Sequence, residues 1–269
     1  MVGLGPPRTE VVAGPHGPLE VLSRGTGEPS TLFVHGLSGS ITSTRPYAGG
    51  VSGRRTFVHI AGHGASQPPP SVTYAALSRE VWAAADHVRA TGVLGISMGA
   101  GAVLSGLARD PSRFRAVVLV LPAALDRPRA DAAMGHFHTL ASLVRTGDVG
   151  AVADYLYAQE PPEVSSIPQV RCWCRERAEA LVAGGPEAAL RQIPGQAPLA
   201  DAASLQSVSA PVLVLAQEDD AVHPVGVARD VARSLPNTQL EVFGPGGLIW
   251  AHRERVRAIV GEFVDQHGA

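Results

Sequence analysis

The chain has 269 residues, of which 45% are apolar and 17% charged, and its formal net charge at pH 7 is −2. This composition excludes a disordered chain, and the length allows one large domain or a domain with an insertion. The charge gives no electrostatic reason to expect nucleic acid or a membrane as a partner. A cytoplasmic location is expected, because the N-terminus does not resemble a signal segment and no apolar run has membrane-spanning length.

Short apolar segments alternate with helical patterns along most of the chain. A helix is predicted over residues 74–89, another over 98–110, and a C-terminal helix that carries Val256, Val260 and Phe263 on one face. The predicted strands are residues 9–14, 17–23, 30–36, 54–64, 91–97, 115–122, 210–217 and 238–244. This alternation predicts an α/β fold with a mostly parallel sheet and helices on both faces.

Residues 123–205 interrupt this alternation, because they contain helical patterns and no convincing strand. The helical segments are residues 130–147, 149–159, 170–185 and 186–193. The segment is too long for an ordinary loop, and a lid over an active site would account for it. We therefore expect a core made of residues 1–122 and 206–269, with a helical cap at 123–205.

The motif with the clearest chemical meaning is Gly95-Ile96-Ser97-Met98-Gly99. A predicted strand ends at Ser97 and a helix begins directly after it, which is the setting of a nucleophile elbow. The glycines leave room for a tight turn, and the start of the helix presents free N–H groups to developing negative charge. The alternative is a serine that only caps the helix.

With this motif in place, the chain resembles the α/β-hydrolase superfamily, in the branch with a helical cap between the sixth and seventh strands. The resemblance rests on FVHGLSGS, AGHGAS, GISMG, VLVLAQEDDAVHP and the last strand and helix, in matching order. It implies that Ser97 is the nucleophile and that the backbone N–H groups of Leu37 and Met98 form the oxyanion hole. It also implies that His35 and His63 are buried structural histidines.

The acid of a catalytic triad is expected after the strand at 210–217. Family patterns place it four residues before a proline, which selects Asp220 ahead of Pro224, with Asp219 as the second candidate. A carboxylate there would orient an imidazole and stabilise its protonated form. The alternative is a carboxylate that caps the following helix.

The general base is harder to place from the sequence. In the resembling enzymes a Gly-His pair follows the last strand, whereas this chain has Gly246-Gly247-Leu248. We expect the base to be His252, reached through a different loop path; the competing hypothesis is a broken triad. His223 is close to Asp220 but is judged to lie on the wrong loop. His136 and His138 lie on the predicted cap, and at most one could face the pocket.

The sequence thus predicts a serine hydrolase for a small or medium, mainly apolar ester, thioester or lactone. No metal or organic cofactor is expected, the partner is a small-molecule substrate, and the oligomeric state is left open. Two alternatives remain: a catalytically impaired ligand-binding protein, and a non-hydrolytic lyase or cyclase that uses the same pocket.

Overall fold

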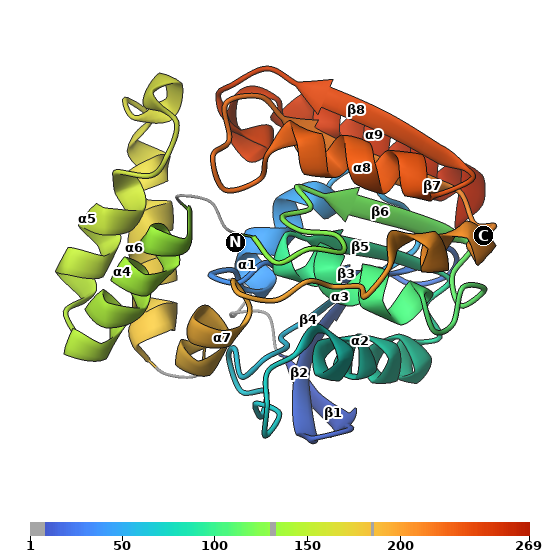
Figure 1. Ribbon diagram of the computed structural model, residues 1–269, viewed down its shortest axis with the longest axis horizontal. Coiled ribbons are helices and arrows are strands. Elements are labelled where there is room, and N and C mark those ends of the chain that lie inside the picture. The colour runs from blue at the N-terminus through green and yellow to red at the C-terminus, as the bar shows by residue number, and fades with distance from the viewer. Residues whose placement is uncertain (1–8, 130–132, 184–185) are drawn as a thin grey trace, which may run out of the picture.

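The computed structural model describes residues 9–129, 133–183 and 186–269. Within these ranges eight strands form one sheet, in the order β1-β2-β4-β3-β5-β6-β7-β8 (Figure 1). The strands are β1 (Glu10–Gly14), β2 (Gly17–Arg24), β3 (Ser30–Val34), β4 (Arg54–Val58), β5 (Gly92–Ile96), β6 (Ala116–Val120), β7 (Val212–Gln217) and β8 (Thr238–Phe243).

The sheet is parallel except at its N-terminal edge. Strand β1 pairs antiparallel with β2, and β2 pairs antiparallel with β4. All pairs from β4 to β8 are parallel. Strands β3, β6 and β7 are buried along their whole length, as expected for parallel strands covered on both faces. The predicted mostly parallel sheet is confirmed.

Helices cover both faces of this sheet. On one side α2 (Tyr74–Val88), α3 (Met98–Leu107) and α8 (Val225–Ser234) share a hydrophobic cluster that includes Leu119 of β6. On the other, α1 (Ile41–Thr44), the 3-10 turn η1 (Arg45–Ala48) and α9 (Arg253–His267) share a cluster that includes Val120. The two neighbouring residues of β6 thus serve opposite faces, which follows from the alternation of side chains along a strand.

A set of helices is inserted between β6 and β7, as the fold-class prediction requires. It contains α4 (Ala133–Thr146), α5 (Val149–Tyr157), the 3-10 turn η2 (Pro162–Val164), α6 (Pro168–Val182) and α7 (Glu187–Gln192). Figure 1 shows α4, α5 and α6 beside the sheet domain. The short turn η3 (Ala202–Ser207) then leads to β7. The ends of two predicted helical segments, at residues 130–132 and 184–185, lie outside the described residues, as do residues 1–8.

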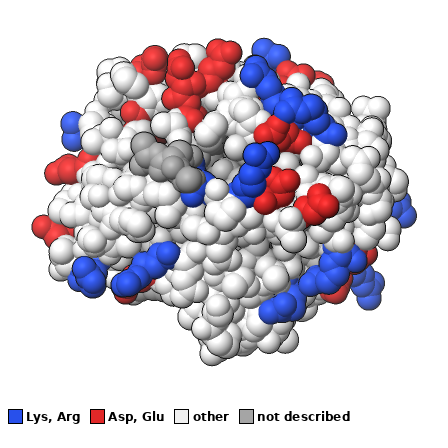
Figure 2. All heavy atoms as spheres, viewed as in Figure 1, with Lys and Arg blue, Asp and Glu red and all other residues white. Residues whose placement is uncertain are grey.

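The surface carries charges of both signs. On the face in Figure 2, basic and acidic side chains are interspersed, and the lower centre shows neither. In the part of the chain that the structure describes, no helix combines the length and apolarity needed to cross a membrane.

Candidate active site

Ser97 occupies a strained turn between β5 and α3. Its φ of 51° and ψ of −108° lie in a region that residues with a side chain seldom adopt. The two motif glycines explain how the turn packs. A Cβ on Gly95 would lie 2.6 Å from the carbonyl oxygen of Gly99, and one on Gly99 would lie 2.7 Å from that of Val34. The strand-turn-helix geometry expected of a nucleophile elbow is therefore present.

The turn after β7 brings a carboxylate and an imidazole to this serine. His223 Nε2 lies 2.9 Å from Ser97 Oγ, and His223 Nδ1 lies 2.8 Å from Asp220 Oδ2. The other carboxylate oxygen of Asp220 accepts hydrogen bonds from the backbone N–H groups of Val222 and His223, at 2.9 and 3.0 Å. Asp220 thus folds the chain back on itself, as in an Asx turn, and holds both the backbone and the ring of His223.

The contacts of His223 define which of its nitrogens carries the proton. A carboxylate only accepts hydrogen bonds, so the Nδ1–H of His223 donates to Asp220. In the neutral ring, Nε2 then holds a lone pair and accepts the hydrogen bond of the Ser97 hydroxyl. This is the polarity that a serine–histidine–aspartate triad needs to deprotonate its serine.

Electrostatics agree with an ionised Asp220. Burial would raise the pKa of this carboxyl, but the hydrogen bond and charge of His223 and two backbone N–H donors outweigh it and lower the pKa below its ordinary value. The side chains of His223 and Asp220 are only 16% and 19% exposed, which limits screening of their interaction by water.

The expectation that His252 would reach Ser97 is wrong. Its ring nitrogen Nε2 lies 2.9 Å from the carbonyl oxygen of Gly244 and 3.1 Å from that of Pro245. His252 sits at the end of a π-helical turn, η4 (Gly247–Ala251), directly before α9, and it closes the loop after β8. The reason is geometric: the glycines bend this loop back on itself, with φ of 109° at Gly246 and 84° at Gly247.

The judgement that His223 lies on the wrong loop is also wrong, because His223 is the histidine whose ring contacts Ser97. The sequence did contain a usable signal, namely an aspartate and a histidine three residues apart directly before Pro224. A tight turn at that spacing brings the two side chains together. Asp219, the second candidate for the acid, is exposed and has a positive φ of 58°, and its neighbour Asp220 makes the contact to His223.

The two histidines of the predicted cap do not take the place of His223. His138 is exposed on α4. His136 is half-buried and stacks on Tyr155, with 5.3 Å between ring centroids. Burial lowers the pKa of His136, and the positive charge of Arg177 lowers it further. The ring nitrogen that accepts the Ser97 hydroxyl belongs to His223.

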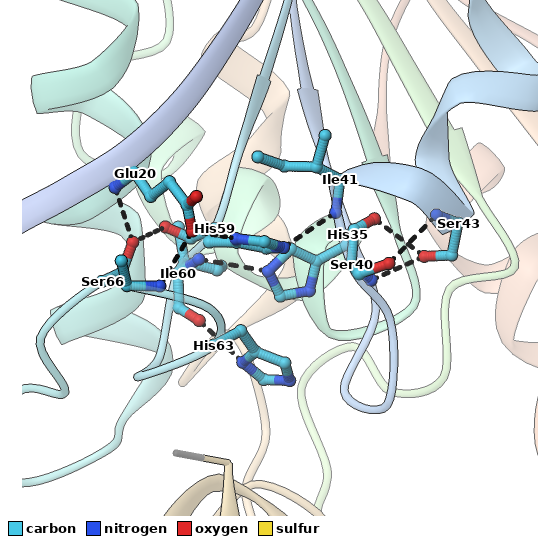
Figure 3. A network of polar contacts seen from close by, with 10 residues as sticks. Glu20, His35, Ser40, Ile41, Ser43, His59, Ile60, His63 and Ser66 are labelled. Carbon is cyan, nitrogen blue, oxygen red and sulfur yellow. Dashed lines mark hydrogen bonds and ion pairs between the residues drawn. The ribbon is translucent and has the colours of Figure 1, made fainter. Parts of the chain in front are cut away.

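The loop after β3 passes close to Ser97 and rests on a network of buried histidines (Figure 3). A Cβ on Gly36 would lie 3.3 Å from Ser97 Cβ. His35 Nδ1 donates to the carbonyl oxygen of Gly36 over 2.7 Å, and its Nε2 accepts from the backbone N–H of Ile60 over 3.1 Å. His63 Nε2 lies 2.6 Å from the carbonyl oxygen of Leu37. Both histidines are buried and hydrogen-bonded, as expected of structural residues.

His59 completes this network. Its Nε2 accepts from the backbone N–H of Ile41 over 2.9 Å, so its Nδ1–H donates to Glu20 over 2.8 Å. Burial lowers the pKa of His35, His59 and His63, to about 4 for His63, so the rings are neutral at pH 7. The three rings thus support the loop that carries Leu37 without a charge of their own. A neutral His63 has one N–H, which lies between two acceptors: Leu37 O is 2.6 Å from its Nε2 and Ile60 O is 2.7 Å from its Nδ1.

A small, mostly apolar cavity opens beside Ser97. Its empty volume is about 310 Å³, including space open to solvent. Leu37 and Met98, the two residues expected to supply the oxyanion hole, line it together with Ser97. The other lining residues are Tyr74, Ala123, Ala124, Arg129, Phe137, Ile193, Pro194 and Gln196. Arg129 also donates to the carbonyl oxygen of Val222 over 2.7 Å, and so braces the turn that carries His223.

The described residues around this site do not form a set of ligands for a metal ion. Among residues 9–129, 133–183 and 186–269, the structure contains no group of three or more His, Cys, Asp or Glu side chains that could hold a metal ion.

Comparisons with known proteins place this geometry in context. No family model matches the chain. It is 28% identical to 2-hydroxymuconate semialdehyde hydrolase of Pseudomonas sp. strain CF600 over 228 residues, which cover 78% of this chain and 76% of that protein.

Two solved structures have the same fold over nearly the whole chain. A thermophilic esterase from Thermogutta terrifontis has a TM-score of 0.76 and 23% identity, covering 96% of this chain and 98% of its own. The enol-lactonase from Burkholderia xenovorans LB400 has a TM-score of 0.76 and 19% identity, covering 95% and 98%. Together with the sheet topology, these similarities show that the chain has the α/β-hydrolase fold, as its motifs implied.

Proposed function

We propose that this protein is a serine hydrolase that cleaves small, mainly apolar esters or lactones with a Ser97–His223–Asp220 triad. The observation that carries the proposal is the continuous hydrogen-bonded series from Asp220 through His223 to Ser97 at the mouth of a cavity. A series with this polarity activates a hydroxyl that is otherwise a weak nucleophile. Because acid and base share one turn, the triad does not need a histidine after β8.

In the proposed mechanism Ser97 Oγ attacks the substrate carbonyl carbon while its proton passes to His223 Nε2. Asp220 stabilises the imidazolium that forms. The carbonyl oxygen gains the negative charge and accepts hydrogen bonds from the backbone N–H groups of Leu37 and Met98. The intermediate then collapses, the C–O bond to the leaving group breaks, and His223 returns the proton to the leaving alkoxide. Water, deprotonated by His223, releases the acid product from Ser97 in the same way.

Three further features support this reaction class. The start of α3 lies directly behind Ser97, where a helix N-terminus favours negative charge. The loop with Leu37 is fixed by neutral histidines, so its N–H group would need little reorganisation. The similar proteins include a hydrolase, an esterase and an enol-lactonase.

The cavity favours small acyl groups. Most of its lining is apolar, with Tyr74, Phe137 and Ile193 among the larger side chains. The empty volume of about 310 Å³ includes open solvent, and only about 20 Å³ has room for the centre of a water-sized group, so the enclosed part of the cavity is small. We therefore propose short acyl esters and small lactones as substrates, ahead of long-chain esters.

The test compares hydrolysis of p-nitrophenyl acetate, butyrate and decanoate, and of the lactone dihydrocoumarin, by wild type, Ser97→Ala and Ser105→Ala. Ser105 lies on the same helix α3 and serves as the matched control. We expect turnover of the short esters or the lactone, a loss of at least about 10³-fold in Ser97→Ala, and wild-type rates in Ser105→Ala. A folded wild type without turnover, or turnover that survives in Ser97→Ala, contradicts the proposal.

A further inference from the structure

The loop that carries Leu37 is held from the sheet domain at two consecutive carbonyl groups. Gly36 O accepts from His35 Nδ1 over 2.7 Å and from the backbone N–H of Gly39 over 2.9 Å. Leu37 O lies 2.6 Å from His63 Nε2. The orientation of the Leu37 N–H depends on this backbone, because each peptide plane is rigid and turns as a unit.

The next residue of the loop is held by the helical insertion instead. Arg177, on α6, donates from Nη2 to Ser38 Oγ over 2.6 Å and from Nε to Ser38 O over 3.3 Å. These two contacts join segments 139 positions apart in the chain. The loop is therefore clamped between the histidine network on one side and α6 on the other.

Arg177 is itself fixed in place by a carboxylate. Its Nη1 donates to Glu160 Oε1 over 3.1 Å, and the two side chains are 21% and 15% exposed. A guanidinium group presents donors in a rigid planar fork, so three contacts through Nε, Nη1 and Nη2 define its position closely. All three of these nitrogens have protein acceptors, which favours a role in holding the loop over recognition of a substrate anion.

We infer that Arg177 is a positioning residue that sets the oxyanion loop at Leu37–Ser38, so that docking of the α4–α7 helices completes the oxyanion hole. This inference rests on the proposed serine hydrolase function. The guanidinium acts through the Ser38 backbone and hydroxyl. Loss of the contact would leave the triad intact and misplace one oxyanion donor. Such a displacement mainly raises the free energy of the transition state, where the negative charge on the oxygen develops.

The experiment uses the full chain and the variants Arg177→Gln, Arg177→Lys, Ser38→Ala and Arg175→Gln. Arg175 is the matched control, because it lies on the same helix, is 66% exposed and pairs with Glu179. For each variant kcat and KM are measured with the best short ester. Affinity is also measured for an aryl trifluoromethyl ketone, which forms a tetrahedral oxyanion adduct with an activated serine. Thermal unfolding verifies that each variant is folded.

We expect Arg177→Gln to lower kcat by about 10- to 100-fold, which is no more than the effect of losing one oxyanion donor completely. Its KM should stay within about threefold of the wild-type value. Trifluoromethyl ketone affinity should fall by the same factor as kcat. Arg177→Lys should recover part of the loss. Ser38→Ala should reproduce part of the loss in kcat. The double variant Ser38→Ala/Arg177→Gln should have the same kcat as Arg177→Gln, because the two residues act through one contact. Arg175→Gln should match wild type.

Three results overturn the inference. Unchanged kcat in folded Arg177→Gln and Arg177→Lys would show that the loop does not need the contact. A rise in KM alone would indicate substrate binding by Arg177. An equal loss in Arg175→Gln would indicate a general effect on α6. Failure of the proposed function looks different: wild type and Ser97→Ala would then have the same rate and neither would bind the ketone, and the inference would fall with it.

Discussion

At the residue scale, the site depends on a four-residue turn from Asp220 to His223. One carboxylate oxygen of Asp220 accepts two backbone N–H groups and the other accepts the imidazole N–H. The same side chain therefore shapes the turn and orients the ring. Pro224 follows directly as the N-cap of α8, and its fixed φ sets the direction in which the chain leaves the turn.

Asp220→Asn should separate the two roles of this carboxylate. The amide oxygen can still accept the backbone N–H groups, but the negative charge that stabilises the imidazolium is lost. We expect kcat for the short ester to fall by about 10³- to 10⁴-fold while the protein remains folded. A change of less than about tenfold would show that the carboxylate is not part of the machinery.

Asp220 also predicts a pH dependence of stability. Because its pKa is lowered in the folded protein, the carboxylate contributes stability at pH values above the ordinary pKa of 3.8. That contribution is lost as the pH falls through the lower folded-state pKa. Urea unfolding of wild type and Asp220→Asn at pH 3 and pH 7 should therefore give a larger difference in unfolding free energy at pH 7.

At the element scale, the apolar pattern of the sequence was a reliable guide. Segments such as residues 116–120 and 212–216 are buried on both faces, so they are apolar at every position and predict parallel strands. The final helix follows its stripe, with Val256, Val260 and Phe263 buried. Burial produces these patterns, and burial dominates the free energy of folding.

The path of short turns was less predictable. His223 and His252 both follow a strand within a few residues of a helix, and composition does not distinguish them. Their side-chain directions depend on local hydrogen bonds, from His223 to Asp220 and from His252 to Gly244 and Pro245. Local hydrogen bonds of this kind leave no periodic signal in the sequence. The elbow at Ser97 was predictable because close backbone packing requires its motif glycines, whereas the direction of the His223 ring depends only on a turn.

Helix α2 contains a buried carboxyl group, Glu80, from which a second pH dependence of stability follows. Glu80 Oε2 accepts from the backbone N–H of Ala61, which has a positive φ of 57°, over 2.8 Å. Its Oε1 has no hydrogen-bond partner among the described residues. Burial raises the pKa of Glu80 to about 7, although the contacts with Ala61 and the charge of Arg79 oppose the shift.

Because this pKa is raised, Glu80 favours the folded state less as the pH rises from 4.5 to about 7. Glu80→Gln keeps an acceptor for Ala61 and cannot ionise. It should be more stable than wild type at pH 8 by up to about 3 kcal/mol, with a much smaller difference at pH 5. Urea unfolding at both pH values tests this, with Glu262→Gln, an exposed site on α9, as the control. A pH-independent difference would contradict it.

At the scale of the whole molecule, helix α6 of the helical insertion contacts the sheet domain near the site. Arg177 of α6 reaches Ser38, and Trp173 of the same helix packs edge-on against Trp250, with 5.8 Å between ring centroids. Trp250 belongs to η4, the turn after β8. The glycine-rich loop after β8, which was expected to lead to the base, therefore provides a contact for α6.

The pair of tryptophans should be energetically coupled. In a double-mutant cycle with Trp173→Ala and Trp250→Ala, we expect a coupling free energy of about 0.5–1.5 kcal/mol in urea unfolding. Trp82 packs on Phe114 instead, so Trp82→Phe combined with Trp250→Ala should be additive. Additivity of the Trp173 and Trp250 substitutions would show that the contact does not hold the two parts together.

The most direct test of the account is the rate at which a fluorophosphonate labels Ser97, read by intact mass, in wild type, His223→Ala and His252→Ala. We predict rapid labelling of wild type and a labelling rate at least about 10³-fold lower in His223→Ala. His252→Ala should be labelled at a rate close to wild type, because the His252 ring contacts Gly244. Labelling that survives in His223→Ala and disappears in His252→Ala would contradict the triad and return the base to the loop after β8.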